Sequence, residues 1–448
     1  MNVFLLRHQK IRLALRKNVC KEFFKEISVL CNMSEQECKT RKRKANVKPD
    51  DLENQSDDEK KQKKPTPRSA LKISIQVIGA VLSLSLLYIV IVPCPIDPIP
   101  VIPAGSLPYF EGVMEENNLL EGIVKIGEGK LQGPESIQVD RNGDIYTGLH
   151  DGRIVKILKS GEIKELARTG ENHKNCGEDS MEHICGRPLG IQLDKKEENL
   201  FICDGYFGLM SLNLASERLT TLVPASKGIK NVPFKFLNHL TVASNGKIYF
   251  TDSSWRWDRK FYAYMLLEGG GKGRVLSYDT KTGETELLLS GLFFPNGITL
   301  SPDEDFLLIC ETASSRILRL FISGSQKGIY DVFQDNLPGF PDNIRTSLEG
   351  GYWLALPGIR KWPFSFLDIV GPYPKIKSLI AKLVPKAHID GFLKPYGLFI
   401  KIDEYGDIIK SYHDPSGATI GFISEVFEDK GVLYLGSFKN NFMGKFRI

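Results

Sequence analysis

The sequence predicts an all-β fold, a six-bladed β-propeller preceded by a single transmembrane helix and a disordered cytosolic tail. Three observations favour this architecture. A pattern of apolar strand, Gly or Asp turn and apolar strand recurs from about residue 120 onward, an uncharged apolar segment precedes that region, and a polar, charge-rich segment comes first. We therefore expect four parts: a cytosolic tail over residues 1–70, a transmembrane helix over 71–92, a proline-rich stalk over 93–119 and a propeller ectodomain over 120–448.

The tail is basic and the rest of the chain is not. Residues 1–70 carry 18 Lys and Arg against 10 Asp and Glu, whereas the whole chain has a net charge of +5. Residues 39–70 have almost no large apolar side chains, so they cannot repay the entropy of ordering. Because nucleic-acid binding needs a basic face on the folded domain itself, we expect no nucleic acid as a partner.

The segment from Ile73 to Val92 contains 20 residues and no Asp, Glu, Lys or Arg. A helix of that length crosses a hydrocarbon core of about 30 Å. Basic residues crowd its amino side, so the positive-inside rule predicts a signal-anchor and a single-pass type II membrane protein. The propeller would then be extracellular or luminal, at the plasma membrane or the endoplasmic reticulum. A buried core helix is the alternative, because four polar side chains dilute the apolar run.

The propeller is predicted from six copies of the strand repeat, spaced about 45 to 55 residues apart. The last copy ends after three strands. We expect "EGIVKIG", near residue 124, to supply the missing outer strand and close the ring. A β-sandwich is the alternative, but more than 300 residues of short strands would be large for one.

Four cysteines lie in the predicted propeller. Cys176 and Cys185 bracket a polar loop, and we expect them to form a disulfide that stabilises the fold by about 2 to 3 kcal/mol. Cys203 and Cys310 lie in apolar strands and are expected to be buried thiols.

The segment over residues 357–392 is too long for a hairpin connection, and its "IKSLIAKLV" portion is predicted to be helical. It could be a lid, a surface helix packed on a blade, or a face that touches lipid.

Oxygen-bearing side chains recur at one phase of the repeat. Glu135, Asn238, Asn296 and Asp342 each precede a residue of the next strand by eleven positions, and Asn343 follows Asp342. In a propeller this phase is the mouth of the innermost strand, so these side chains should converge on the central channel. Taken singly, Pro-Asn-Gly and Pro-Asp-Asn predict turns, but the shared phase favours a common site.

Two carboxylates with two or three amides form a hard oxygen cage that suits Ca²⁺. Zinc would need nitrogen or sulfur ligands, and none is in phase. A Ca²⁺ with an open position could polarise an ester or lactone carbonyl, or it could be structural and tie blades together.

The catalytic base is less clearly marked in the sequence. No Gly-x-Ser-x-Gly elbow indicates a covalent serine route. His239, beside Asn238, and Glu425, near the mouth of the last blade, are the candidate catalytic bases. His150 and His413 are expected on surface turns.

The motifs "CGRPLGI", "IYFTDSS", "PGFPDNIR" and "HDPSGATIGFISEV" resemble the strictosidine synthase-like six-bladed propeller family. The resemblance implies a type II membrane glycoprotein with arylesterase-type activity on small aryl esters. It also implies Ca²⁺ ligands at the five positions above, since related paraoxonases and gluconolactonases bind Ca²⁺ with Glu, Asn and Asp there. The histidine proposed as the paraoxonase base corresponds to Leu189, and the synthase glutamate corresponds to Ser424 and not to Glu425. Synthase activity is therefore not expected.

The leading hypothesis is a membrane-anchored, Ca²⁺-dependent hydrolase of small esters or lactones. The alternative is a non-catalytic cell-surface propeller that binds a partner or lipid and holds a structural Ca²⁺.

Overall fold

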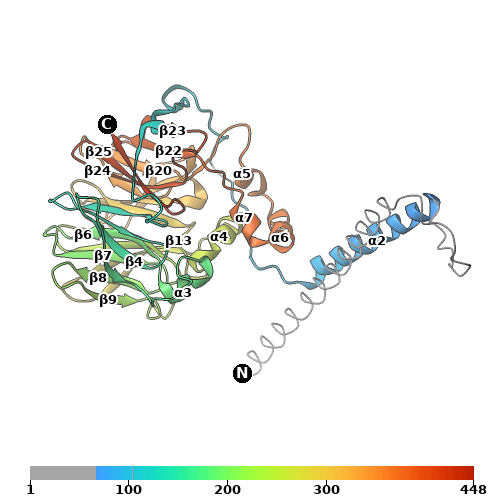
Figure 1. Cartoon of the computed structure of the whole chain (residues 1–448), viewed down its shortest axis with the longest axis horizontal. Helices are drawn as coiled ribbons and strands as arrows, with labels where there is room; N and C mark the ends of the chain where they lie inside the picture. Colours follow the sequence, from blue (N-terminus) through green and yellow to red (C-terminus); the bar gives the residue numbers. More distant parts are fainter. Residues whose placement is uncertain (1–66, 103) are drawn as a thin grey trace, which may run out of the picture. The chain divides into compact units, whose positions relative to one another are not determined.

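A computed structural model describes residues 67–102 and 104–448. The predicted cytosolic tail lies almost entirely outside these residues. Helix α2 spans Pro67–Ile91, which covers most of the predicted transmembrane segment (Figure 1). Within the described ranges, no helix is both long enough and apolar enough to cross a membrane. The predicted span over residues 71–92 therefore stays a prediction.

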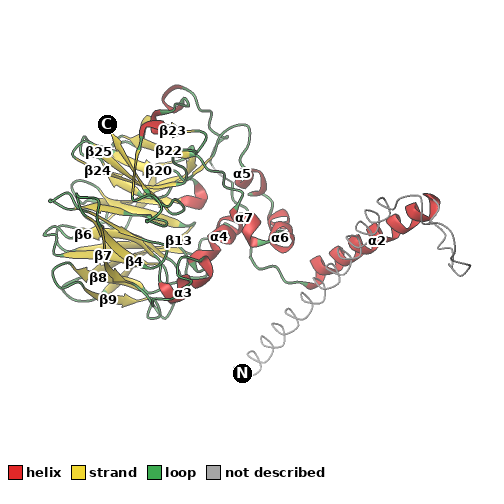
Figure 2. Ribbon diagram, viewed as in Figure 1, coloured by secondary structure: helices red, strands yellow, loops and turns green. Residues whose placement is uncertain are grey.

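Residues 124–447 form six four-stranded antiparallel sheets, the blades of a propeller, which confirms the predicted all-β, six-bladed architecture (Figure 2). Blade 1 contains β2 (Ile137–Val139), β3 (Ile145–Gly148), β4 (Arg153–Ile157) and β5 (Ile163–Arg168). Blade 2 contains β6 (Pro188–Leu193), β7 (Asn199–Asp204), β8 (Gly208–Asn213) and β9 (Arg218–Pro224). Blade 3 contains β10 (Leu237–Val242), β11 (Lys247–Asp252), β12 (Gly273–Asp279) and β13 (Thr285–Leu292).

The second half of the ring has the same order from the centre outward. Blade 4 contains β14 (Pro295–Leu300), β15 (Phe306–Glu311), β16 (Arg316–Phe321) and β17 (Tyr330–Gln334). Blade 5 contains β19 (Ile344–Thr346), β20 (Tyr352–Ala355), β22 (Gly397–Ile402) and β23 (Ile408–Asp414). Blade 6 contains β24 (Ile423–Asp429), β25 (Val432–Ser437), β26 (Met443–Arg447) and β1 (Val124–Ile126).

The ring closes through β1, the first strand among the described residues. It pairs with β26 in antiparallel register, with Val124 opposite Lys445. The predicted outer strand near residue 124 is therefore confirmed. The inner strands β2, β6, β10, β14, β19 and β24 contact one another in turn, and β24 contacts β2. These strands are almost wholly buried, and the apolar core is divided into clusters between neighbouring blades.

Four short helices lie together beside the blades (Figure 1). Helix α4 (Tyr262–Glu268) follows β11, whereas β21 (Gly358–Ile359), α5 (Phe366–Val370), α6 (Pro374–Leu383) and α7 (Lys386–Asp390) form the insertion between β20 and β22. Helix α4 contacts both α6 and α7. The predicted helix in "IKSLIAKLV" is α6.

The proline-rich segment packs against these helices. Ile96 is buried, and the Val101 N–H donates a hydrogen bond to the Gly371 oxygen at 3.0 Å. The Lys377 ammonium donates to the Ile99 oxygen at 2.6 Å. Over these residues the predicted stalk is thus attached to the insertion and is not a free spacer. We retain its boundaries as a prediction.

The remaining short elements and the disulfide lie in the connections before, within and between the blades. Cys176 and Cys185 form the predicted disulfide, and Cys203 and Cys310 are buried free thiols as expected. The other elements are η1 (Gly112–Met114), η2 (Leu119–Gly122), η3 (Asp179–Met181), α3 (Glu182–Cys185), η4 (Arg259–Phe261), η5 (Thr312–Ser314) and β18 (Gly339–Phe340).

Candidate metal site in the propeller channel

Irregular pairing opens several inner strands where they enter the channel. In β10 the register shifts around Asn238, and in β14 it shifts around Asn296. A bulge of this kind re-aims the side chains that it encloses. Each asparagine is the second residue of its strand and lies within the shift. The irregular pairing lets both side chains face a common cavity, whereas the residues that follow in each strand pair regularly.

The Pro-Asn-Gly sequence at residues 295–297 belongs to β14, so the turn that it predicts in isolation is wrong. A Cβ atom on Gly297 would lie 2.4 Å from the carbonyl oxygen of Asp342. The Gly297 N–H instead donates a hydrogen bond to that oxygen at 3.2 Å. Glycine is required here because the chain before β19 approaches β14 so closely, and this approach brings Asn296 and Asp342 together.

Four of the five predicted ligands line one cavity. Glu135, Asn238, Asn296 and Asp342 all contribute to a space of about 60 Å³. They come from blades 1, 3, 4 and 5. Asn343 is buried next to Asp342 but is not one of the lining residues. For four of the predicted ligands, the shared position in the sequence repeat therefore corresponds to a shared cavity in the structure.

Four residues of this group each have one buried side-chain oxygen that lacks a hydrogen-bond partner. Among the described residues, Oδ1 of Asn238, Asn296, Asp342 and Asn343 accepts no hydrogen bond. Each such atom costs about 1–3 kcal/mol when it is left unsatisfied. The oxygens are thus free to bind a ligand.

A hard cation fits this donor set. Ca²⁺ takes six to eight oxygen ligands and accepts amide oxygens together with carboxylates. Glu135 and Asp342 would supply the negative charge, whereas Asn238 and Asn296 would supply neutral oxygens.

The electrostatics of the two acids also favour a cation. Burial raises the pKa of Asp342 well above its usual range, and the nearby carboxylates of Glu135 and Glu425 raise it further. Burial likewise raises the pKa of Glu135, although the Arg187 guanidinium opposes the shift. Bringing two buried carboxylates together is unfavourable unless a positive charge compensates them.

Arg187 is a site residue that the sequence analysis did not identify. Its side chain is fully buried, with Nη2 3.2 Å from Glu135 Oε2 and Nη1 donating to the Gly133 oxygen at 3.0 Å. It positions the Glu135 carboxylate from the neighbouring blade. The sequence does contain an indication of this role, because Arg187 comes directly before the apolar start of an inner strand. A cation at such a position is buried and therefore needs an acidic partner.

His239 and Glu425 lie in a separate group of fully buried side chains. His239 Nε2 is 3.7 Å from Glu425 Oε2, and Nδ1 is 3.2 Å from the Ile298 backbone nitrogen. Arg345 donates to Glu425 Oε1 at 2.8 Å and to Ser136 Oγ at 3.1 Å. Neither His239 nor Glu425 lines the 60 Å³ cavity. Their assignment as catalytic bases stays a prediction.

Arg345, also absent from the sequence-derived site, controls the charge of this group. Burial opposes ionisation of Glu425, yet the Arg345 guanidinium holds the pKa of that carboxyl below its ordinary value. Burial lowers the pKa of His239, and Arg345 lowers it further. Glu425 is therefore held ionised and His239 neutral.

A second polar cluster lies near the disulfide loop. His150 Nε2 is 3.1 Å from Asp179 Oδ1 and 3.2 Å from Glu182 Oε1. These three residues could hold a metal ion. However, Glu182 Oε1 also accepts a hydrogen bond from Arg259 at 2.6 Å, so a guanidinium already occupies one of the would-be ligand atoms. His413, expected on a surface turn, is fully buried in β23 with Nδ1 2.9 Å from the Tyr396 hydroxyl, so that expectation was wrong.

Two family profiles match the propeller. Residues 238–325 match strictosidine synthase, and residues 112–157 match the N-terminal region of the strictosidine synthase-like proteins. The fold and these matches define a strictosidine synthase-like six-bladed propeller.

Curated relatives extend the match over most of the chain. Adipocyte plasma membrane-associated protein from Gallus gallus is 42% identical over 381 residues, which cover 85% of this chain and 88% of that protein. The Homo sapiens protein of the same name is 41% identical over 84% of this chain and 87% of its own length. The chain belongs to the adipocyte plasma membrane-associated protein family.

The fold is shared more widely. A gluconolactonase structure from Xanthomonas campestris superimposes with a TM-score of 0.50 at 15% identity, covering 79% of this chain and 98% of that one. At this identity the likeness concerns the propeller fold alone.

Proposed function

We propose that this protein is a membrane-anchored, Ca²⁺-dependent hydrolase of small esters or lactones, with arylesterase-type or lactonase-type activity. The observation that carries the proposal is the set of buried oxygens without hydrogen-bond partners, three of which belong to residues lining one cavity. Acids and amides arranged in this way form an oxygen cage for a hard divalent cation.

A Ca²⁺ bound in this cage would act as a Lewis acid toward the carbonyl oxygen of an ester or lactone. Glu135 and Asp342 would hold their charge at the cavity, and Arg187 would keep the Glu135 carboxylate in place. Arg259 and Tyr262 also line the cavity and could contact the substrate. We retain His239 and Glu425 as the proposed catalytic bases; they lie 3.7 Å apart beside the small cavity without lining it, and Arg345 donates to Glu425.

A non-catalytic propeller with a structural Ca²⁺ is the second candidate function. The ligands come from four blades, so a cation among them would also hold those blades together. In that case a partner or lipid would bind at the surface, and the site would contribute stability without turnover.

The membrane anchor is proposed from three features. Residues 73–92 contain no Asp, Glu, Lys or Arg, and the relatives carry plasma-membrane association in their name. Helix α6 also places apolar side chains outward: Ile376, Leu379 and Leu383 are 45%, 41% and 46% exposed, whereas Lys377 is buried. Apolar residues turned to the outside are suited to a lipid surface.

The test of the hydrolase proposal is phenyl acetate turnover by the full-length chain in detergent, with Ca²⁺ and after chelation. Asp342→Ala and Asn296→Ala should lower kcat/KM at least 100-fold while circular dichroism stays that of a folded propeller. Asp303→Ala removes an exposed carboxylate from a blade 4 turn and serves as the matched control. Turnover that survives both site substitutions and chelation would refute the hydrolase mechanism. Loss of thermal stability on chelation without any turnover would favour the structural ion.

A further inference from the structure

A larger chamber adjoins the proposed ion site. Its volume is about 300 Å³, against about 60 Å³ for the cavity that the oxygen ligands line. The two spaces share five lining residues: Tyr262, Leu266, Phe340, Gly358 and Leu393. The smaller cavity has room for about two water molecules at ~30 Å³ each. It can therefore hold a reacting group but not the rest of a substrate.

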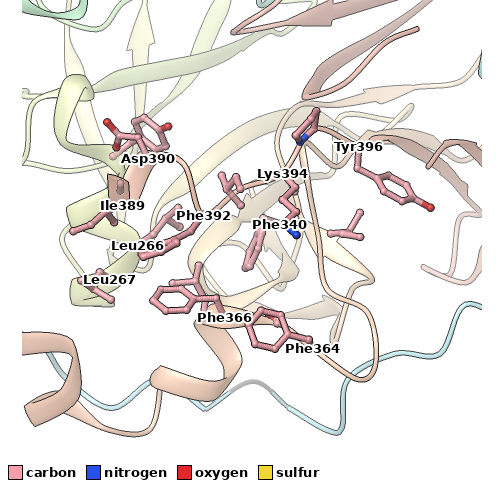
Figure 3. A pocket seen from close by; sticks show the side chains of 18 of the residues that line it. Leu266, Leu267, Phe340, Phe364, Phe366, Ile389, Asp390, Phe392, Lys394 and Tyr396 are labelled. Carbon is pink, nitrogen blue, oxygen red and sulfur yellow. The ribbon is translucent and has the colours of Figure 1, made fainter. Parts of the chain in front are cut away.

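The walls of the chamber are mainly apolar. Helix α4 forms one side with Leu266 and Leu267, and the insertion forms the other with several aromatic rings (Figure 3). Phe366 and Phe392 lie with their ring centroids 4.2 Å apart. Leu266 lines the same space as these two rings. Segments about one hundred residues apart in sequence thus combine to form one apolar space.

The polar side chains on these walls are largely bound to other groups. The Tyr396 hydroxyl donates to Glu116 at 2.8 Å, and Ser365 Oγ donates to Asp368. Asp390 Oδ2 accepts from Lys386 at 2.7 Å, although Asp390 Oδ1 has no partner among the described residues. Because the Asp390 charge is compensated, the chamber offers a ligand mainly apolar contacts.

Two aromatic side chains of the chamber are also exposed to solvent. Phe364 is 65% exposed and Phe392 is 41% exposed, and both line the chamber. Exposed apolar side chains grouped around a concave space mark a binding site for an apolar ligand.

We propose that the chamber binds the apolar arm of the substrate, so that the preferred substrates are esters or lactones with a medium-length alkyl or aryl-alkyl chain and not acetyl esters. This inference rests on the proposed function. The carbonyl group sits in the small cavity among Glu135, Asn238, Asn296 and Asp342, and the chain extends past Leu266 and Phe340 between α4 and the insertion. The insertion is then the wall of a substrate-binding chamber, which explains its length.

The test is a chain-length series of 4-nitrophenyl esters, from acetate to octanoate, with the full-length chain in lipid nanodiscs. A buried methylene is worth about 0.8 kcal/mol, which predicts a rise in kcat/KM of up to about fourfold per added methylene until the chamber is full. Phe392→Ala should lower the ratio of kcat/KM for octanoate to that for acetate about tenfold or more. Tyr330→Ala is the control, since Tyr330 is an exposed aromatic residue of β17, at 52%, that lies outside the chamber.

Binding of 4-nitrophenyl octyl ether, which cannot be hydrolysed, separates the two proposals. Saturable binding that Phe392→Ala weakens supports the chamber even if no ester is turned over, and that result would overturn the hydrolase proposal alone. Turnover of acetate with no gain along the series, together with no binding of the ether, would overturn the chamber and leave the hydrolase proposal standing.

Discussion

The guanidinium of Arg345 lies 2.8 Å from the carboxylate of Glu425, which is 80 residues away in sequence and belongs to the next blade. Both side chains are buried, and Arg345 also donates to Ser136 Oγ of blade 1 and the Ile191 oxygen of blade 2. One side chain from blade 5 thus links three other blades across the channel.

We expect Arg345→Met to be strongly destabilising, by about 3–5 kcal/mol, because it leaves the Glu425 carboxylate buried and unpaired. The Arg345→Met/Glu425→Met double variant should recover much of this loss, since both charges are gone. Chemical unfolding of the full-length chain in detergent measures both values. Equal stability of the single and double variants would show that the ion pair is not the source of the effect.

Ca²⁺ should raise the thermal midpoint of the full-length chain, because a ligand that binds only the native state stabilises it. The gain is about 2.7 kcal/mol at a concentration one hundred times Kd. Asp342→Ala should abolish the shift, and the exposed control Asp303→Ala should keep it. This measurement is independent of turnover, so a shift that persists in Asp342→Ala would place the ion elsewhere.

Gly297→Ala should destabilise the protein by about 1–3 kcal/mol, since its Cβ would meet the Asp342 carbonyl oxygen at 2.4 Å. The clash should also displace Asp342 and reduce the Ca²⁺-dependent shift in the thermal midpoint. Gly122→Ala is the control, because no atom lies within 4 Å of a Cβ at that position. A normal Ca²⁺ response in Gly297→Ala would contradict the role given to this close approach.

Acid should destabilise the fold through His413. Burial lowers its pKa to about 4, with Glu116 opposing the shift and Lys361 adding to it. Between that value and about 6.5 the unfolded chain binds the proton and the folded chain does not, so stability is complete above pH 6.5 and falls as the pH drops toward 4. The contribution is up to about 3 kcal/mol.

The matching variant for this prediction is His413→Gln, which cannot titrate. Its free energy of unfolding should depend less steeply on pH between 6.5 and 4 than that of the parent chain. If the free energy of unfolding depended on pH equally steeply in the two proteins, His413 would have the same pKa in the folded and the unfolded chain.

Much of the fold could be predicted because it repeats. The strand pattern defined six blades, and the incomplete last copy pointed to the strand near Val124 that closes the ring. The disulfide between Cys176 and Cys185 followed from a short polar loop. The common phase of Glu135, Asn296 and their equivalents predicted that they meet, since equivalent positions in a ring of blades face the same channel.

The sequence by itself thus determined the strand repeat and the position of the oxygen-bearing side chains within it. Hydrophobic periodicity is a local property, so it can be recognised without knowing which segments contact one another. Only the tertiary structure decided the rest. Arg187 and Arg345 find their carboxylates 52 and 80 residues away, and the chamber exists because α4 and the insertion meet beside the channel. Buried charge pairs and apolar cavities depend on which distant segments are in contact, and these contacts form only when the blades close into a ring.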